Sequence, residues 1–439
     1  MVQVLLINPA WPGLVSRRGQ RYNRAWPPLD LLNCAALLQR QGLSVELADA
    51  RARPLSPAYL RRRAREADWV VITSSPLDRW QCPNLELEYF LDLARGLEHP
   101  RLVICGVHGT VEPGPVLGRS RAFALVLGEP EQTVAQLVER GRRQGVAGLA
   151  WLEGGEVVTS GPRPPLDLDR LPRPAFELAP PAWYSYQPLG SHLALLETSR
   201  GCPYHCSFCL KAMYGPGVRF KSPERVAREA RVLARLGARR VYVMDLDFTA
   251  SRSHALAVCR ALSGSGLTWC CQARADQVDR PLLRAMAASG CALIHFGVES
   301  ASRQALRRSG KGLEPEQVVR AVDRARSLGM ATACFFLFGL PGESPADRAR
   351  TASLARRLKT DYCSFHRVTP YPGTRLFQDS DLPDPFFAAE TGPRDEIDAA
   401  LRRAYLGFYL QPARLFRILA RSRPGDWVAG LRLLAGFLR

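Results

Sequence analysis

The sequence lacks the features of a membrane-spanning or exported protein. No apolar run approaches the roughly twenty residues that a transmembrane helix needs. The opening apolar run, residues 2–7, ends at Asn8-Pro9 and has neither a basic leader nor a cleavage site. We therefore expect a cytoplasmic protein. A length of 439 residues is long for one hydrophobic core, so two domains and an appendage are expected.

Lysine is scarce, although the chain carries a formal charge of +19. Only four of its 60 basic residues are lysine, and the arginines are scattered along the whole chain. Nucleic-acid-binding proteins concentrate positive charge on one face, so this distribution predicts no nucleic-acid partner. A disulfide framework is not expected either, because the 12 cysteines occur in a chain without a secretory leader.

The first third of the chain alternates short apolar runs with amphipathic segments. These runs end in small or turn residues, namely Asn8-Pro9, Ser74-Ser75, Gly106 and Gly128. Such alternation predicts a parallel sheet with helices on both faces, and open sheets of this kind bind ligands at the carboxyl edge of their strands. We therefore expect an α/β fold that begins with a Rossmann-like, doubly wound domain over residues 1–149.

Prolines accumulate over residues 150–190, which predicts an extended linker. The alternation then resumes with six predicted strands, at 192–198, 241–244, 268–272, 292–298, 331–338 and 362–368. Six β-α steps fall short of the eight in a closed barrel, so we expect an open (β/α)6 partial TIM barrel over residues 191–378. The pattern of residues 379–439 predicts a basic, helical C-terminal tail.

Three cysteines, Cys202, Cys206 and Cys209, lie within eight residues at the carboxyl end of the first of these strands. Thiolate sulfur is the ligand that iron-sulfur clusters take. A [4Fe-4S] cube has four irons, so three local ligands leave one iron open unless a distant cysteine closes it. The alternatives are a zinc site and cysteines that only pack. A structural zinc site usually uses two separated cysteine pairs, and no second CxxC pair follows here.

The CxxxCxxC spacing, with Phe208 before the last cysteine, resembles the radical S-adenosylmethionine (radical SAM) superfamily. The resemblance extends to motifs that follow successive predicted strands, at 244–249, 272–276, 296–300, 338–343 and 369–374. It implies a [4Fe-4S] cluster on the three cysteines and SAM chelated by the open iron. It further implies reductive cleavage of SAM to a 5′-deoxyadenosyl radical, driven by an electron donor such as flavodoxin or ferredoxin.

Several residues of these motifs suit SAM chemically. The predicted SAM-binding residues are Phe208, Asp245, Asp247, Arg274, Glu299 and Gly339. The carboxylates can accept hydrogen bonds from the amino group or ribose hydroxyls of SAM, and the arginine can pair with its carboxylate. The glycine lets the backbone approach the cofactor closely. Each residue alone is a weak signal, and their shared position after predicted strands strengthens the set.

Residues 1–149 resemble the cobalamin-binding domain that precedes many radical SAM modules. The predicted cobalamin-binding residues are Pro9, Ser74, Ser75, Gly106, His108, Gly128 and Glu129. Small side chains at strand ends leave room for the nucleotide tail of cobalamin. The Asp-x-His-x-x-Gly motif that supplies a cobalt-ligating histidine is absent, and His108 lies in another context. We therefore expect cobalamin without a histidine ligand, or alternatively a degenerate domain that no longer binds it.

The whole arrangement resembles cobalamin-dependent radical SAM methylases and the relatives of magnesium-protoporphyrin monomethyl ester cyclase and hopanoid methylases. It implies methylation of an unactivated carbon in a small-molecule, lipid or natural-product substrate. One alternative is oxidative cyclisation or rearrangement with the same cofactors. Another is a non-enzymatic, basic, metal-stabilised module that binds nucleic acid or a cofactor. The aromatic, basic segments 401–410 and 415–419 predict either closure of the open barrel or peripheral contact with the inner face of the membrane.

Overall fold

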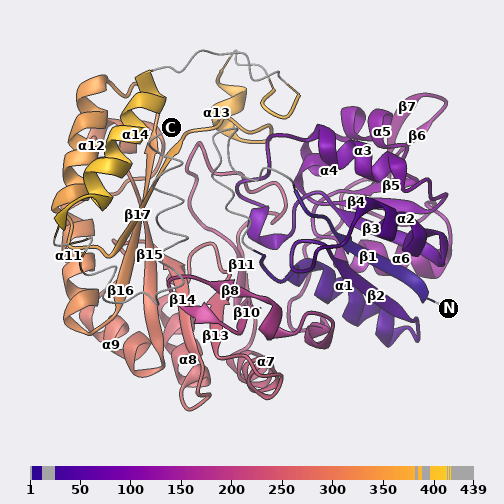
Figure 1. Cartoon of the computed structure of the whole chain (residues 1–439), viewed down its shortest axis with the longest axis horizontal. Coiled ribbons are helices and arrows are strands. Elements are labelled where there is room, and N and C mark those ends of the chain that lie inside the picture. The colour runs from indigo at the N-terminus through magenta and orange to yellow at the C-terminus, as the bar shows by residue number, and fades with distance from the viewer. Residues whose placement is uncertain are drawn as a thin grey trace.

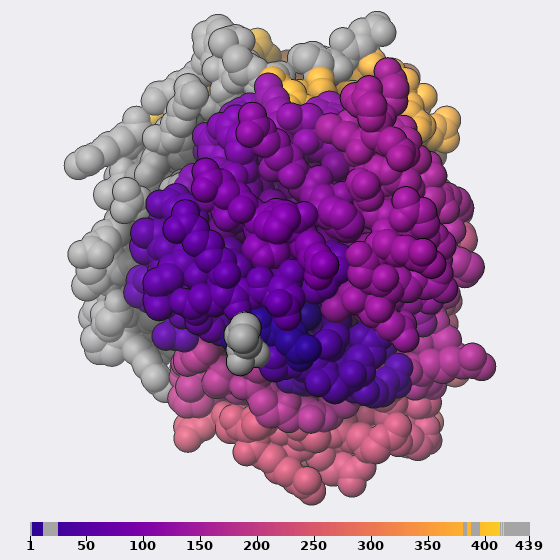
Figure 2. Space-filling view, turned by 90° about the vertical axis from the view of Figure 1, so that its right-hand side faces the viewer, coloured from indigo at the N-terminus to yellow at the C-terminus, as the bar shows by residue number. Residues whose placement is uncertain are grey.

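The chain is organised by two large sheets that lie side by side. The computed structural model describes residues 2–11, 25–380, 384–387, 396–412, 414 and 416. Figure 1 shows the seven-stranded first sheet on the right and the six-stranded second sheet on the left. Figure 2 views the molecule from the side of the first sheet, with the pink second part of the chain below it. None of the helices in the described ranges has the length and apolarity needed to cross a membrane.

The first sheet has a parallel centre and an antiparallel edge, in the order β2-β1-β3-β4-β5-β6-β7. Its strands are β1 (Val2–Asn8), β2 (Val45–Asp49), β3 (Ala67–Thr73), β4 (Leu102–Cys105), β5 (Ala124–Val126), β6 (Leu149–Glu153) and β7 (Glu156–Thr159). The helical segments between them are α1 (Leu29–Arg40), α2 (Pro57–Arg65), η1 (Leu77–Arg79), α3 (Glu88–Gly96), α4 (Val107–Val111), α5 (Pro113–Ser120) and α6 (Glu131–Arg140).

Both faces of the first sheet are covered, as the near-continuous apolar runs of its strands require. Successive side chains of a strand point to opposite faces. Leu5 and Ile7 of β1 therefore join one buried cluster with residues of α2, α3 and α5. Val4 and Leu6 join a second cluster with residues of α1 and α6. The carboxyl ends of β1, β3 and β4 are thereby held at one edge of a sheet that is buried on both faces.

The start of the predicted linker belongs to the first sheet. Residues 149–153 and 156–159 form the hairpin β6-β7, in which β6 pairs antiparallel with β5. Gly154 and Gly155 both have positive φ and make its turn. Proline content alone does not reveal this hairpin, because the prolines begin only at residue 162. The rest of the segment contains η2 (Phe176–Leu178), η3 (Pro181–Trp183) and the short pair β8 (Ser185–Tyr186) and β9 (Gly190–Ser191).

The second sheet is parallel, and its strands follow one another in chain order from β10 to β17. They are β10 (Leu193–Leu196), β13 (Arg240–Val243), β14 (Thr268–Ala273), β15 (Cys291–Glu299), β16 (Ala331–Phe338) and β17 (Tyr362–Arg367). The helices between them are α7 (Pro223–Arg235), α8 (Arg252–Leu262), α9 (Arg280–Ala288), α10 (Arg303–Arg308), α11 (Pro315–Ser327) and α12 (Pro345–Arg357). Helices α7, α8, α9, α11 and α12 follow the outer side of the sheet (Figure 1). All six predicted strands are present, and the mixed α/β class with parallel sheets is confirmed.

The last strand is covered by the C-terminal helix α14 (Glu396–Tyr409), which follows the short α13 (Arg375–Gln378). The backbone N–H of Phe365 donates to the Tyr405 hydroxyl over 3.0 Å, and the Tyr409 hydroxyl donates to the Cys363 carbonyl over 2.7 Å. These bonds satisfy backbone groups that an exposed edge strand would leave open. Within the predicted tail, α14 thus packs against the second sheet, whereas Phe386 joins a buried cluster of the first sheet. Most of the predicted segment 415–419 lies outside the described residues.

Candidate functional site

The three cysteines lie on a loop that leaves β10 and is closed by a small hairpin. β11 (Ser199–Gly201) pairs antiparallel with β12 (Val218–Phe220), and the cysteines lie between these strands. Asp245, at the end of β13, accepts the N–H groups of Thr198 and Ser199 over 2.7 and 3.0 Å. Burial raises the pKa of Asp245 to about 6. Its carboxylate is therefore occupied in fixing the backbone where the chain turns into the cysteine loop.

Backbone contacts from distant segments fix the cysteine loop itself. The Ser207 N–H donates to the Ser309 carbonyl, and the Ser207 carbonyl accepts the Leu376 N–H, both over 2.9 Å. Lys211 donates to the carbonyls of Cys202 and Tyr204, which lie inside the loop. These partners belong to the end of α10, to α13 and to the loop itself. Their hydrogen bonds hold the cysteine loop in an irregular conformation that needs no helix or strand.

The three thiols are half-buried, and their charges would act on one another. Burial raises the pKa of all three, and the pKa of Cys209 reaches about 12 because the other two thiols add to the effect of burial. The positive charges of Lys211 and Lys311 oppose this shift. Within the described ranges, no three His, Cys, Asp or Glu side chains converge as ligands of a single ion. A cubane cluster takes each cysteine on a different iron, and three thiols on one cation-flanked loop fit that donor set.

Asp247 and Arg274 lie beside this loop, and each has one unsatisfied polar atom. The Asp247 Oδ1 atom accepts the Thr249 hydroxyl over 2.6 Å, whereas its buried Oδ2 atom has no hydrogen-bond partner among the residues that the structure describes. Arg274 donates to Asp276 over 3.0 and 2.9 Å and stacks on Tyr204 with 3.8 Å between guanidinium carbon and ring centroid. Its buried Nη1 atom likewise has no hydrogen-bond partner within the described part of the chain. An open acceptor and an open donor are what the ammonium and carboxylate of an amino-acid group would satisfy.

Glu299 ends β15 in a left-handed conformation, with φ of 67°. Its Oε1 atom accepts the Lys311 ammonium over 2.9 Å, and both side chains are nearly buried. Lys311 also lies close enough to Cys206 to lower the pKa of that thiol. Sequence reasoning did not select Lys311. The rarity of lysine in the sequence could have pointed to this residue. Three of the four lysines lie in or beside this region, namely Lys211, Lys221 and Lys311.

The two remaining predicted SAM residues are also near this edge. Phe208 is half-buried within the cysteine loop. Gly339 follows β16 with φ of 94°, and its N–H donates to Glu343 Oε2 over 2.5 Å. A side chain at Gly339 would be strained by that backbone conformation. The structure therefore brings all six predicted residues to the carboxyl edge of the second sheet, where the cysteine loop lies.

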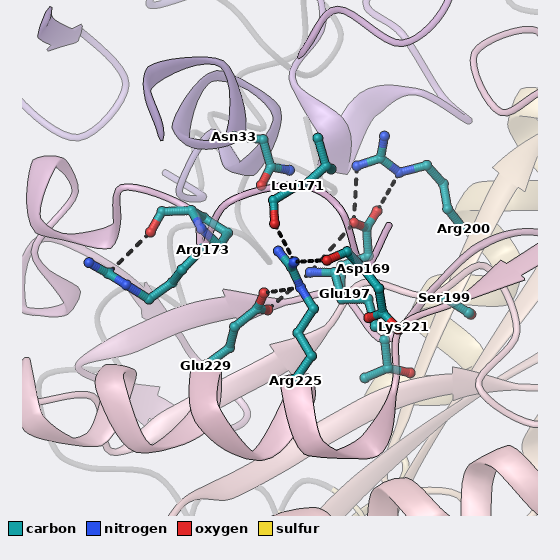
Figure 3. A network of polar contacts seen from close by, with 12 residues as sticks. Asn33, Asp169, Leu171, Arg173, Glu197, Ser199, Arg200, Lys221, Arg225 and Glu229 are labelled. Carbon is teal, nitrogen blue, oxygen red and sulfur yellow. Dashed lines mark hydrogen bonds and ion pairs between the residues drawn. The ribbon is translucent and has the colours of Figure 1, made fainter. Parts of the chain in front are cut away.

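A buried network of charges joins the cysteine loop to the first sheet, and Figure 3 shows the part of it around Arg200, Glu197 and Arg225. Arg200 is fully buried and donates to Glu197 over 2.8 Å and to Glu131 over 2.9 Å. Its guanidinium lies 3.5 Å from Glu129 and 5.6 Å from the ring centroid of Trp80. Glu131 is the first residue of α6, which follows β5 of the first sheet, and Glu129 lies two residues before it. Arg200 is two residues before Cys202.

The network continues through the hairpin partner β12 into α7. Arg219 donates to Glu129 over 3.0 Å, and Lys221 donates to Glu229 over 3.0 Å. Arg225 binds Glu229 over 2.8 Å and also reaches carbonyls of the linker. Sequence reasoning placed Glu129 at the cobalamin site. The structure shows its carboxylate paired with arginines of the cysteine hairpin.

The other predicted cobalamin residues gather at the carboxyl edge of the first sheet. Gly106 has φ of 109°, and a Cβ there would lie 2.7 Å from the Ser74 hydroxyl. The Ser75 hydroxyl accepts the Val107 N–H over 2.7 Å. His108 contacts the Ser74 hydroxyl over 3.0 Å and the Asn84 carbonyl over 2.8 Å. Burial lowers the pKa of His108 to about 4, and both of its ring nitrogens are engaged by protein.

Pro9 and Gly128 complete this edge after β1 and β5. Pro9 is buried, and Gly128 has φ of 76° with its N–H donating to the Thr110 hydroxyl over 3.0 Å. Between the two sheets, the Gln81 amide donates to the Cys209 sulfur over 3.6 Å. The loop that follows β3 at the carboxyl edge of the first sheet therefore contacts the cysteine loop directly.

Comparisons with known proteins agree with this geometry. Residues 196–355 match the model of the radical SAM superfamily. An uncharacterized methyltransferase of Pyrococcus horikoshii is 28% identical over 95% of this chain and 94% of its own length. The anaerobic magnesium-protoporphyrin IX monomethyl ester cyclase of Rubrivivax gelatinosus is 28% identical over 86% of this chain and 70% of its own length.

Two solved structures share the fold. The radical S-adenosylmethionine methyltransferase TsrM of Kitasatospora setae matches with a TM-score of 0.70 and 21% identity, over 86% of this chain and 77% of its own. The cobalamin-dependent radical enzyme OxsB matches with a TM-score of 0.66 and 18% identity, over 86% of this chain and 55% of its own. The chain therefore contains a radical SAM domain over residues 196–355 and is an enzyme, and this domain implies a [4Fe-4S] cluster and SAM as cofactors.

Proposed function

We propose that the protein is a cobalamin-dependent radical SAM methylase that acts on an unactivated carbon of a small molecule. Cys202, Cys206 and Cys209 hold the cluster, and residues 1–149 bind cobalamin. The segment 150–190 connects this domain to a partial-barrel core at 191–378, which the helical region 379–439 completes. The observation that carries the proposal is the 3.6 Å contact between Gln81 and Cys209, because it joins the ligand edge of the first sheet to the cysteine loop.

The two similar structures support both cofactors. TsrM has cobalamin and a [4Fe-4S] cluster bound, and OxsB has aqua-cobalamin and S-adenosylmethionine bound. When bound, these groups supply one-electron chemistry and a methyl carrier. The protein supplies their placement and the exclusion of water.

The residues around the loop suit the amino-acid part of SAM. Asp247 Oδ2 offers an unpaired buried acceptor to the ammonium group, and Arg274 Nη1 offers an unpaired buried donor to the carboxylate. Tyr204 holds the guanidinium plane by stacking, so that its open nitrogen has a fixed direction. Asp245 has a different role, because its oxygens bind the backbone at Thr198 and Ser199 and so position the loop.

A cluster of packed aromatic side chains lies within the second sheet. His295 accepts or donates through both ring nitrogens, to the Tyr186 hydroxyl over 3.0 Å and to the Tyr242 hydroxyl over 2.7 Å. Trp26 contacts both tyrosine rings, with centroids 5.2 and 5.1 Å away. This buried cluster excludes water from the inner face of the strands. Reactive groups at the carboxyl edge are thereby protected from one side.

Oxidative cyclisation or rearrangement is the second candidate, and it is favoured by the 28% identity to the cyclase of Rubrivivax gelatinosus. The two reactions differ in product mass. Methylation adds a methyl group to the substrate, whereas oxidative cyclisation removes hydrogens. Both need an electron donor, for which flavodoxin or ferredoxin is our proposal.

The test is anaerobic reconstitution of the full chain, followed by iron, sulfide and cobalamin analysis. We expect about four irons per chain and one cobalamin, with deoxyadenosine formed after addition of SAM and reductant. Cys206→Ala should lose the deoxyadenosine and most of the iron. Cys259→Ala, in the buried face of α8, is the matched control and should keep both. Zinc in place of iron, or deoxyadenosine from the Cys206 variant, would contradict the proposal.

A further inference from the structure

The loop after β3 crosses from the first sheet to the second. The Trp80 ring packs edge-on against Tyr214 with centroids 5.2 Å apart, and Gln81 reaches Cys209. The Pro83 carbonyl accepts the Tyr371 hydroxyl over 3.5 Å, just beyond the end of β17. Arg79 and Cys82 belong to the same loop. They therefore lie at the junction of the two sheets, beside the cysteine loop.

Arg79 is a cation that shares its nearest carboxylate, Asp78, with Arg51. Asp78 is held by Arg51 through two hydrogen bonds of 3.2 and 3.4 Å, so its charge is already paired. The Arg79 Nε atom lies 3.7 Å from Asp78, which is too far for a hydrogen bond. This nitrogen is buried and has no hydrogen-bond partner among the described residues. Two guanidinium groups share one carboxylate, and an uncompensated buried charge is costly.

Apart from Asp78, the groups that act on the charge of Arg79 are Arg51, Cys82 and Tyr371. His366 at the end of β17 has an exposed side chain, and the positive charge of Arg79 acts on it. The thiol of Cys82 is exposed, and the positive charge of Arg79 favours its thiolate. The carboxylate that acts on Cys82 is Glu299, which is already paired with Lys311. The junction thus presents an open guanidinium, an imidazole and a thiol.

We infer that Arg79 binds an anionic group of the substrate, a carboxylate or a phosphate-type oxyanion, at this junction. The inference rests on the proposed function and names the substrate class. A guanidinium has a planar set of donors that matches two oxygens of such a group, and the buried Nε of Arg79 is one of the open donors at the junction. A bound oxyanion would supply the counter-charge that Asp78 cannot give to two arginines.

Cys82 allows this inference to be tested without knowing the substrate. The full chain, with its cluster reconstituted so that the loop cysteines are occupied, is alkylated with iodoacetate or iodoacetamide. The rate at Cys82 is measured by peptide mass spectrometry. Both reagents react with the same thiolate, but only iodoacetate is charged. The rate with iodoacetate divided by the rate with iodoacetamide therefore reports how strongly the surroundings of Cys82 attract an anion. We expect Arg79→Gln to lower this ratio about fivefold, since one nearby positive charge is removed.

Two further variants separate charge from folding. Arg79→Lys should keep most of the ratio, because it retains the charge. Arg235→Gln, on the exposed face of α7, removes a positive charge elsewhere and should leave the ratio unchanged. An equal ratio in Arg79→Gln and the parent protein overturns the inference. Circular dichroism and iron content of each variant show whether the fold and the cluster persist, so this failure is distinct from failure of the proposed function.

Competition provides the second arm. Inorganic phosphate or malonate should protect Cys82 from iodoacetamide in the parent protein and should not protect it in Arg79→Gln. Absence of protection by both anions overturns the inference. Complete protection from both reagents by hydroxocobalamin alone also overturns it, because the position would then belong to the corrin rather than to an anionic substrate.

Discussion

Asp30 gives the first sheet a built-in pH dependence. It lies in the first turn of α1, is fully buried, and accepts the Leu77 N–H over 3.2 Å through Oδ1. Its Oδ2 atom is buried and has no hydrogen-bond partner in the described ranges. Burial, with the negative charges of Glu131 and Asp78, raises the pKa of Asp30 from 3.8 to about 7. The folded protein therefore holds a proton on Asp30 that the unfolded chain releases.

The sign and size of the effect follow from this shift. Because the pKa is raised in the folded state, the contribution of Asp30 to stability is complete below pH 3.8 and is lost as the pH rises through about 7. A shift of about three units corresponds to about 4 kcal/mol in total. Roughly 2 kcal/mol of this is lost between about pH 5.5 and pH 8.

Asp30→Asn should remove this loss. The amide keeps an oxygen for the Leu77 N–H and carries no charge at any pH. Denaturant unfolding of the parent and variant at a series of pH values gives the difference in their free energies of unfolding. Other titrating groups largely cancel in this difference, which should change by about 2 kcal/mol in favour of the variant from about pH 5.5 to pH 8. A difference that stays constant with pH would refute the reasoning. Asp92→Asn, at an exposed position of α3, is the control and should show no such trend.

Three further perturbations test the loop and its supports. Arg200→Met leaves Glu131 and Glu197 buried without their arginine partner, so the free energy of unfolding in denaturant should fall by about 3–5 kcal/mol. The double variant Arg200→Met with Glu131→Gln should recover part of this stability. A double variant no more stable than the single one would contradict the pairing. Gly106→Ala places a Cβ 2.7 Å from the Ser74 hydroxyl at a φ of 109°. The melting temperature of this variant should therefore fall by an amount equivalent to about 1–3 kcal/mol. An unchanged melting temperature would exclude this close approach. Asp245→Ala removes the acceptor of two backbone N–H groups at the start of the cysteine loop, so the iron content after reconstitution should fall. Full iron content would show that the loop does not need these two hydrogen bonds.

The strands of the second sheet could be predicted because each is a short apolar run bounded by glycine or polar residues. β16 was predicted at the same residues at which it occurs, and β13 differs by one residue at each end. The hairpin β6-β7 was missed because it lies beside a proline-rich segment. The pairing of Arg200 with Glu131 spans 69 residues, and no local pattern reports such a contact. The role of Glu129 was therefore assigned from its position at a strand end rather than from its partner.

The charge network explains how two separately covered sheets come to share one site. Four basic residues, Arg200, Arg219, Lys221 and Arg225, face four carboxylates, Glu129, Glu131, Glu197 and Glu229. Buried ion pairs add little net stability, because desolvation offsets most of the Coulomb attraction. Breaking them is costly, however, so any other docking of the hairpin on the first sheet would leave charges buried and unpaired. The balanced set thus selects one arrangement, in which the loop that carries Arg79 and Gln81 faces the cysteines.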